Sequence, residues 1–299
     1  MKRPASPLDF AMFPAVVALG ALATHAGLMW GGSAEVVTVV VTVLSIVAVG
    51  LLERARPERV AFRTPDQPLR VEIGHFLLGV EVGSTLGLLA AQALGLVIAR
   101  ALAAGPDPPG AVLWPTHWPL AAQILVALAL GDLGSYVQHR AMHVFGRLWP
   151  FHAVHHALGR LSLLKAGTFS PVDIAALTIF TYLPLVALGA SEVILTWVTT
   201  MAVVTGLLQH ANLRQRTPRW LDAVVCTPAV HWQHHARARA TSEGNYAVTF
   251  SAIDRVFGTY LAPEPRATVE IGAEGESPPV GLWAQIVEPF RRSFGSKRP

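Results

Sequence analysis

Long runs of apolar residues alternate with short polar segments over most of the chain. Six runs approach or reach the roughly 20 residues that a membrane-spanning helix needs; they are 11–30, 36–52, 76–104, 119–137, 172–188 and 193–209. The third run is long enough for one tilted span or for a bent pair of helices. The pattern therefore predicts an all-α fold, a polytopic bundle of about four to six transmembrane helices.

Positive charge falls on one side of this predicted topology. With six spans, 22 of the 23 lysines and arginines lie in the termini or in the 53–75, 138–170 and 210–299 segments, and Arg100 is the exception. Lysine and arginine accumulate in cytoplasmic segments, so both termini and these segments are predicted to be cytoplasmic. Topology alone then accounts for the isoelectric point of about 9.6, and no nucleic-acid partner is expected.

Composition supports the membrane interpretation. The chain has 299 residues, of which 52% are hydrophobic and only 14% charged, whereas about a quarter of the residues of a soluble domain are charged. Cys226 is the single cysteine, which excludes a disulfide scaffold. The richness in Ala, Arg and Pro favours a bacterial inner-membrane protein.

Histidine is the residue type that suggests chemistry. Nine of the twelve histidines fall in the predicted cytoplasmic segments as one HxxxH motif, two HxxHH motifs and one histidine near Asn212. These nine are His139, His143, His152, His155, His156, His210, His231, His234 and His235. Residues three and four apart share a helix face, and neutral imidazole binds iron, zinc and copper. One ion takes at most about six ligands, so nine imidazoles indicate at least two metals.

Rings that bind metals need acceptors for their outward N–H groups. Five residues are predicted to orient the ligating rings in this way: Asp132, Tyr136, Asn212, Glu243 and Asp254. Asp132 could equally pair with an arginine such as Arg140. Asp173 is interpreted as a first-turn residue of a helix that Ser170 caps. His25 and His117 are predicted to have no metal role.

The order of these residues along the chain resembles that of a known family. The order Asp132, Tyr136, His139-Arg, His143, then both HxxHH motifs and Asp254-Arg-Val-Phe-Gly-Thr-Tyr260 resembles the fatty acid hydroxylase and sterol desaturase superfamily over about 131–261. The resemblance implies that the nine histidines are catalytic and hold two iron ions, with O2 as co-substrate. It also implies a lipid or isoprenoid substrate drawn from the bilayer and electrons from a separate donor such as a ferredoxin, cytochrome or flavoprotein reductase.

The resemblance suggests a division into three parts: N-terminal spans over 1–130, a di-iron catalytic domain with further spans over 131–262, and a cytoplasmic tail over 263–299. The apolar patch at 280–290 in this tail either lies at the membrane surface or belongs to a loosely ordered segment. Several positions depart from the sterol-acting pattern, most clearly Ser170 where a histidine is usual before the proline. The departure at Ser170 favours a hydroxylase or monooxygenase of a lipid or isoprenoid over a sterol desaturase, while hydroxylation and desaturation of the substrate both stay open.

Other functions remain open at this stage. A b-type cytochrome would need histidine pairs on facing spans, whereas these motifs are local triplets. A histidine-rich metal transporter or metal-binding membrane protein without oxygenase activity is the main alternative, although transport would place polar residues within several spans. Zinc could also replace iron in purified protein, because affinity alone selects iron poorly.

Overall fold

The computed structural model describes residues 4–102 and 113–295 of the chain. Lys2, Arg3 and the beginning of the predicted 105–118 loop lie outside the described residues. Within them the predicted all-α fold is confirmed, because β-structure is limited to two isolated bridges. The helices are α1 (Pro7–Met29), α2 (Ala34–Ala55), α3 (Leu69–His75), α4 (Gly83–Leu102), α5 (Leu120–Val144), α6 (Trp149–His156), α7 (Pro171–Ala187), α8 (Glu192–His210), α9 (Arg219–Asp222), α10 (Pro228–His234), α11 (Arg239–Ser242), α12 (Ser251–Val256) and α13 (Leu282–Phe294).

Five helical segments in the described residues are long and apolar enough to cross a membrane. They are α1, α2, the run Leu69–Ala101, α5 and α8. The third predicted run is one continuous helix, since a π-helical segment, Phe76–Val82, joins α3 to α4. The remaining predicted span is α7, which has 17 residues. At 1.5 Å per residue it is about 26 Å long, shorter than a hydrocarbon core of about 30 Å.

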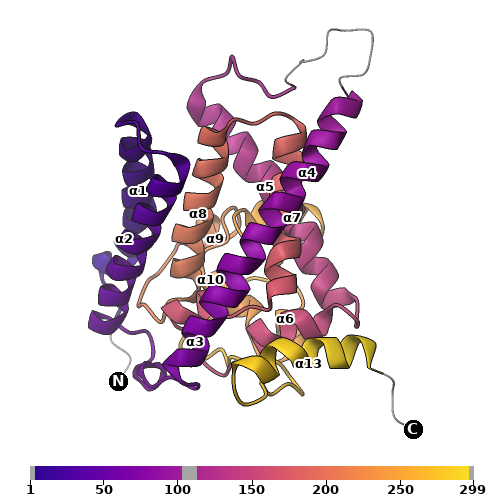
Figure 1. Cartoon of the computed structure of the whole chain (residues 1–299). Helices are drawn as coiled ribbons and strands as arrows, with labels where there is room; N and C mark the ends of the chain where they lie inside the picture. The colour runs from indigo at the N-terminus through magenta and orange to yellow at the C-terminus, as the bar shows by residue number, and fades with distance from the viewer. Residues whose placement is uncertain (1–3, 103–112, 296–299) are drawn as a thin grey trace.

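The spans form a bundle with a helical cap at one end (Figure 1). The α1–α2 hairpin packs against α8, while α4 and α5 pack on α7. The short helices α6, α10 and α13 gather at the lower end of the view. The cap is therefore built under the ends of the spans, where polar side chains from several segments can meet.

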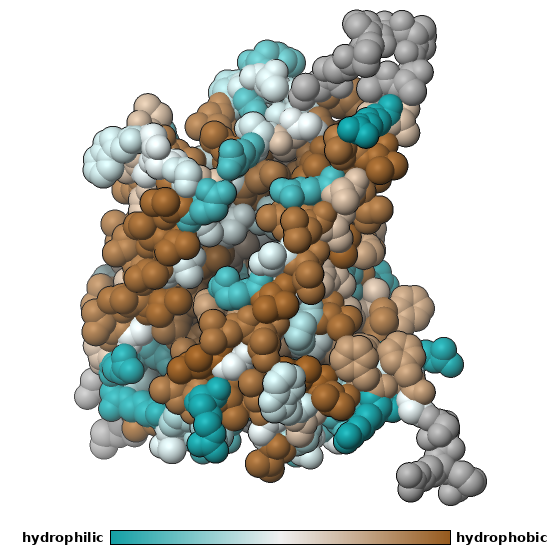
Figure 2. Space-filling view, viewed as in Figure 1, coloured by the Kyte–Doolittle hydropathy of each residue, from teal (hydrophilic) through white to brown (hydrophobic). Residues whose placement is uncertain are grey.

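The outside of the bundle is apolar. Figure 2 shows hydrophobic side chains over the flanks of the spans, and Leu22, Leu51 and Val97 are 64%, 63% and 64% exposed. Contiguous apolar surface of this extent marks contact with lipid and not with water. The composition and the exposed surface together make this a multi-pass membrane protein.

Small residues allow the spans to approach closely, as is common in membranes. Gly134 of α5 lies against the backbone of α7, and a Cβ atom added there would be 1.9 Å from the Phe180 carbonyl oxygen. Because the clash is with backbone, Gly134→Ala should destabilise the protein by about 1–3 kcal/mol or more. Thermal unfolding in detergent measures this loss.

Gly206 of α8 provides the matched control, since a Cβ added there meets nothing within 4 Å. Gly206→Ala should leave the melting temperature unchanged or raise it slightly, because alanine favours helix more than glycine does. Equal melting temperatures for the two variants would contradict the close α5–α7 contact.

The segment predicted as a tail is built into the cap as far as residue 295. Arg266 is buried and its guanidinium donates to the carbonyls of Ala211 and Leu213 at the end of α8. Farther along, α13 packs against α6 and α3. The C-terminal segment therefore supports the elements that carry the histidines.

Candidate metal centre

Four helices deliver the nine histidines to one end of the bundle. His139 and His143 lie in the last turns of α5, and His210 ends α8. The first HxxHH motif lies in α6, which has a proline in its first turn. The second motif lies in α10, which begins at Pro228 with Thr227 as the N-cap residue, and His235 follows the last residue of this helix. All nine side chains are buried.

The nine rings form two groups whose possible ligand nitrogens lie within 4.8 Å of one another. The five-histidine group consists of His139, His143, His152, His156 and His234. The four-histidine group consists of His155, His210, His231 and His235. The structure thus brings together all nine predicted ligands, and each of the two groups is large enough to hold one metal ion.

Neighbouring Nε2 atoms within each group are spaced as ligands of one ion. In the five-histidine group, His152 Nε2 lies 3.0 Å from the Nε2 atoms of both His139 and His156. In the four-histidine group, His210 Nε2 lies 3.1 Å from His155 Nε2 and 2.9 Å from His231 Nε2. Two nitrogens 2.0–2.1 Å from an ion and at right angles are about 3 Å apart. The spacing therefore fits a metal in each group.

Hydrogen bonds on the outer side of the rings fix which nitrogen points inward. The Nδ1 atoms of five rings lie near backbone or carboxylate oxygens, namely His139 with Tyr246 O (2.7 Å), His152 with Asp173 Oδ2 (2.7 Å), His155 with Thr168 O (3.1 Å), His210 with Gly206 O (2.8 Å) and His234 with Gly244 O (2.8 Å). These oxygens accept the Nδ1–H proton, which leaves the Nε2 lone pair for a metal.

Two further observations fit metal binding. The Nε2 atoms of His143 and His234 are buried and have no hydrogen-bond partner among the described residues. Burial lowers the pKa values of His155, His156, His231 and His235 well below the usual value, and lowers the pKa of His234 to about 3. These rings are neutral at pH 7, the form that binds metal.

The lowered pKa values predict how stability depends on pH. A histidine that is neutral when buried binds more protons once unfolded, so stability is present above the unfolded pKa of about 6.5 and is lost as the pH falls toward the folded pKa. Each such histidine changes the free energy of unfolding by up to about 1.4 kcal/mol per pH unit. Metal-free protein should therefore melt at a lower temperature at pH 5.5 than at pH 7.5. A melting temperature that is constant over this range would contradict the neutral, buried state of the rings.

The five residues predicted to orient the rings lie around the site, but the described contacts show no direct hydrogen bond from them to a histidine. Asp132 accepts from the backbone N–H groups of Val248 and Phe250, and not from Arg140. Asp254 accepts from the N–H of Tyr246, whose carbonyl oxygen in turn faces His139. Asp254 therefore acts on a ring through the backbone.

The other three residues bond to partners other than the histidines. Tyr136 contacts Thr259 and Arg140 through its hydroxyl, and Asn212 pairs with the backbone of Arg59. Glu243 is exposed and pairs with Arg239. Glu243 also helps to line a cavity beside two of the histidines.

Asp173 is the residue that the sequence interpretation missed. It does lie in the first turn of α7 with Ser170 as N-cap, as predicted, but its carboxylate also bonds His152, and its other oxygen accepts from Gln138 Nε2 at 3.0 Å. No local spacing links it to His152. One feature of the sequence could have identified Asp173: it is an ionisable residue at the start of an apolar run. Such residues in membrane proteins are usually functional or paired.

A cavity of about 200 Å³ adjoins the five-histidine group. Its floor includes His143, Trp149 and His156, and its charged lining residues are Arg237, Arg239, Glu243, Glu274 and Glu276. The volume equals that of roughly six or seven waters in the liquid. A polar group of moderate size can therefore approach the five-histidine group here.

The family model and the similar proteins both indicate one family of lipid hydroxylases. Residues 124–259, which contain all nine histidines, match the model of the fatty acid hydroxylase family. The chain is 31% identical over 256 residues to the ornithine lipid hydroxylase OlsE of Rhizobium tropici, covering 85% of this chain and 75% of that protein.

Similarity extends to animal enzymes over a shorter region. The chain is 26% identical over 163 residues to the alkylglycerol monooxygenase of Homo sapiens, covering 54% of this chain and 35% of that protein. It is 31% identical over 133 residues to the enzyme of the same name in Danio rerio, covering 44% of this chain and 29% of that protein. It therefore spans about a third of these two proteins. No solved structure matches the chain.

Proposed function

Because this chain belongs to the fatty acid hydroxylase family, we propose that it is a membrane-bound di-iron monooxygenase that uses O2 to hydroxylate a membrane lipid. The observation that carries the proposal is the convergence of nine buried histidines in two adjacent groups. We infer that the five-histidine group and the four-histidine group each hold one iron. When bound, the iron pair supplies the oxidant that attack on an unactivated C–H bond requires.

The protein's own residues orient the histidine rings, keep them in the neutral form and affect how strongly they bind metal. The oxygens that accept the Nδ1–H protons hold five rings in one tautomer and orientation. Burial keeps the rings neutral, the form that binds metal. Asp173 places a negative charge against His152, which makes that ring a stronger ligand.

The substrate is proposed to be a lipid with a charged headgroup. The relative in Rhizobium tropici is named an ornithine lipid hydroxylase, which makes an ornithine lipid the first substrate to test. The cavity at His143 and His156 supports this choice, because arginine and glutamate side chains line it and suit a carboxylate and an ammonium group. On this proposal the reacting carbon lies in or near the headgroup.

The proposed reaction also needs a source of electrons. Insertion of one oxygen atom of O2 into a C–H bond, with the second atom leaving as water, consumes two electrons and two protons. An iron–sulfur cluster needs about four cysteine ligands, and this chain has only Cys226. We therefore propose a separate ferredoxin, cytochrome or flavoprotein reductase that meets the enzyme on the side of the cap. The distribution of Lys and Arg supports the proposal that this side is cytoplasmic.

Metal analysis combined with product analysis tests the proposal. Protein expressed with ample iron should contain close to two irons per chain, without a haem absorption band. Given a reductant and O2, it should add one oxygen atom to ornithine lipid, and tandem mass spectrometry should place that atom in the headgroup fragment. Two metals without any oxygenated lipid, together with metal uptake into vesicles, would favour the transporter alternative. An oxygen found in the acyl fragment would keep the oxygenase and reject the headgroup assignment.

A further inference from the structure

The C-terminal helix α13 presents an apolar stripe to its surroundings. Trp283, Val287, Phe290 and Phe294 are 69%, 39%, 44% and 70% exposed. Steps of four, three and four residues put these side chains on one face of the helix. Arg291 is exposed next to this stripe.

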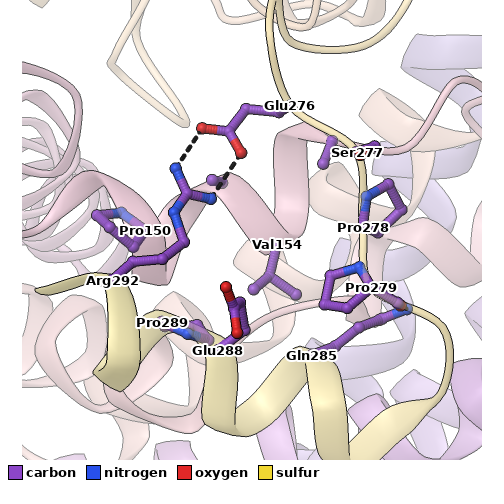
Figure 3. Close-up of a pocket in the computed structure, with 12 residues that line it drawn as sticks. Pro150, Val154, Glu276, Ser277, Pro278, Pro279, Gln285, Glu288, Pro289 and Arg292 are labelled. Carbon is purple, nitrogen blue, oxygen red and sulfur yellow. Dashed lines mark hydrogen bonds and ion pairs between the residues drawn. The ribbon is translucent and has the colours of Figure 1, made fainter. Parts of the chain in front are cut away.

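The opposite face of α13 is bound to the cap. Gln285 is only 3% exposed, and its Oε1 lies 2.6 Å from Nε2 of His75 in α3. Pro289 is buried against α6 in the small cleft of Figure 3. Phe290 additionally meets the Phe151 ring edge-on at 5.0 Å. These contacts fix the rotation of α13 and leave Trp283 and Phe294, at the two ends of the stripe, 69% and 70% exposed.

The position of α13 identifies what covers the stripe. In Figure 1, α13 runs across the direction of the spans, beside the beginning of α3. In Figure 2 the hydrophobic surface of the spans continues toward the lower right, where α13 runs. A contiguous apolar surface that joins the lipid-facing flank is covered by the same lipid.

We propose that α13 lies in the headgroup region of the leaflet nearest the metal centre, with the stripe inserted among the lipid chains. An amphipathic helix at this depth buries its apolar face about 5–10 Å into the boundary and keeps basic residues near anionic headgroups. Arg291, which is exposed beside the stripe, can contact anionic headgroups in this position. The helix lies outside residues 124–259, the part that matches the family model.

The same helix braces the wall of the cavity beside the five-histidine group. Arg292 of α13 makes two 2.6 Å hydrogen bonds to the Glu276 carboxylate (Figure 3). Glu276 Oε1 also accepts from the Trp149 indole N–H at 2.9 Å. The Trp149 ring centroid lies 5.1 Å from that of His143. Insertion of α13 in the leaflet therefore holds the cavity wall in place at the membrane surface.

Lipid contact can be measured directly because Cys226 is the only cysteine and is buried. Phe294→Cys is labelled with an environment-sensitive fluorophore and reconstituted in nanodiscs containing brominated lipid. Ala267→Cys, at an exposed turn position that lines neither the cavity nor the small cleft, is the matched control. Brominated lipid should quench the label at 294 about threefold more than the label at 267, as expected for a site 5–10 Å deep in the boundary. Equal quenching, or stronger quenching at 294 by soluble iodide, overturns the proposal.

Hydrogen exchange in nanodiscs tests whether α13 holds the cavity wall in place. The double variant Trp283→Ser, Phe294→Ser should speed amide exchange in 272–294 about tenfold. Val256→Ser replaces an apolar residue that is 80% exposed but lies away from α13, and it should leave this segment unchanged. Unchanged exchange in the double variant rejects the bracing role. Neither readout requires bound metal or turnover, so failure of the proposed chemistry would not affect these results.

Discussion

Replacing His234 or His155 with alanine should lower lipid hydroxylation by about a thousandfold or more, because the oxidant depends on a complete metal centre. His234 belongs to the five-histidine group and His155 to the four-histidine group, so each variant should lose the metal of one group first. The measurements are metal content per chain and product yield under single-turnover conditions. Membrane insertion should persist, because neither residue lies in one of the five long apolar helices.

The matched controls are histidines of the same chain outside both groups. His25 lies in α1 with its ring 6.5 Å from the Trp197 ring, and His117 lies beside Trp118. His25→Ala and His117→Ala should keep both metals and full activity. Full activity of His234→Ala or His155→Ala, or loss of activity in a control, would refute the assignment of the ligands.

Replacing Asp173 with asparagine should reduce metal affinity and activity by about 10–100-fold, the usual effect of losing the partner of a ligating histidine. The carboxylate accepts from His152 Nδ1 and from Gln138 Nε2 at once. An asparagine can offer its oxygen to only one of these donors and turns its NH2 group toward the other. Titration of metal into metal-free protein measures the loss of affinity.

Ser170→Ala separates this effect from the structure of α7. Ser170 Oγ accepts from the Asp173 backbone N–H at 3.3 Å as the helix cap. Its removal should cost about 1 kcal/mol of stability and leave metal affinity unchanged. If both variants lose stability equally and Asp173→Asn keeps its metal affinity, the Asp173–His152 contact has only a structural role.

The sequence predicted the elements well because their signals are local. Apolar runs such as 36–52 identify spans by length and hydropathy, and α2 occupies this run. The 172–188 run showed where a helix lies, but the number of its helical residues depends on the Ser170 cap and the turn after Ala187. The predicted cytoplasmic orientation and the three-part division of the chain stay predictions.

The motif spacing predicted that eight of the histidines would lie together, since residues three and four apart share a helix face, and the family resemblance added His210. It could not determine how the nine are divided. Each HxxHH motif is split between the groups: His152 and His156 lie in one and His155 in the other, while His231 and His235 lie apart from His234.

In each motif the i and i+4 rings stay together, and the i+3 ring, about 100° around the helix from i+4, faces the other group. The geometry of a single helix does not decide which of its histidines joins which group. That assignment depends on where α5 and α8 place His139, His143 and His210. The contact between Asp173 and His152 could not be predicted from the sequence for the same reason. It depends on how α7 packs beside α5 and α6. The chain by itself therefore predicted the nine proposed ligands, and only the tertiary structure decided their grouping and their supporting hydrogen bonds.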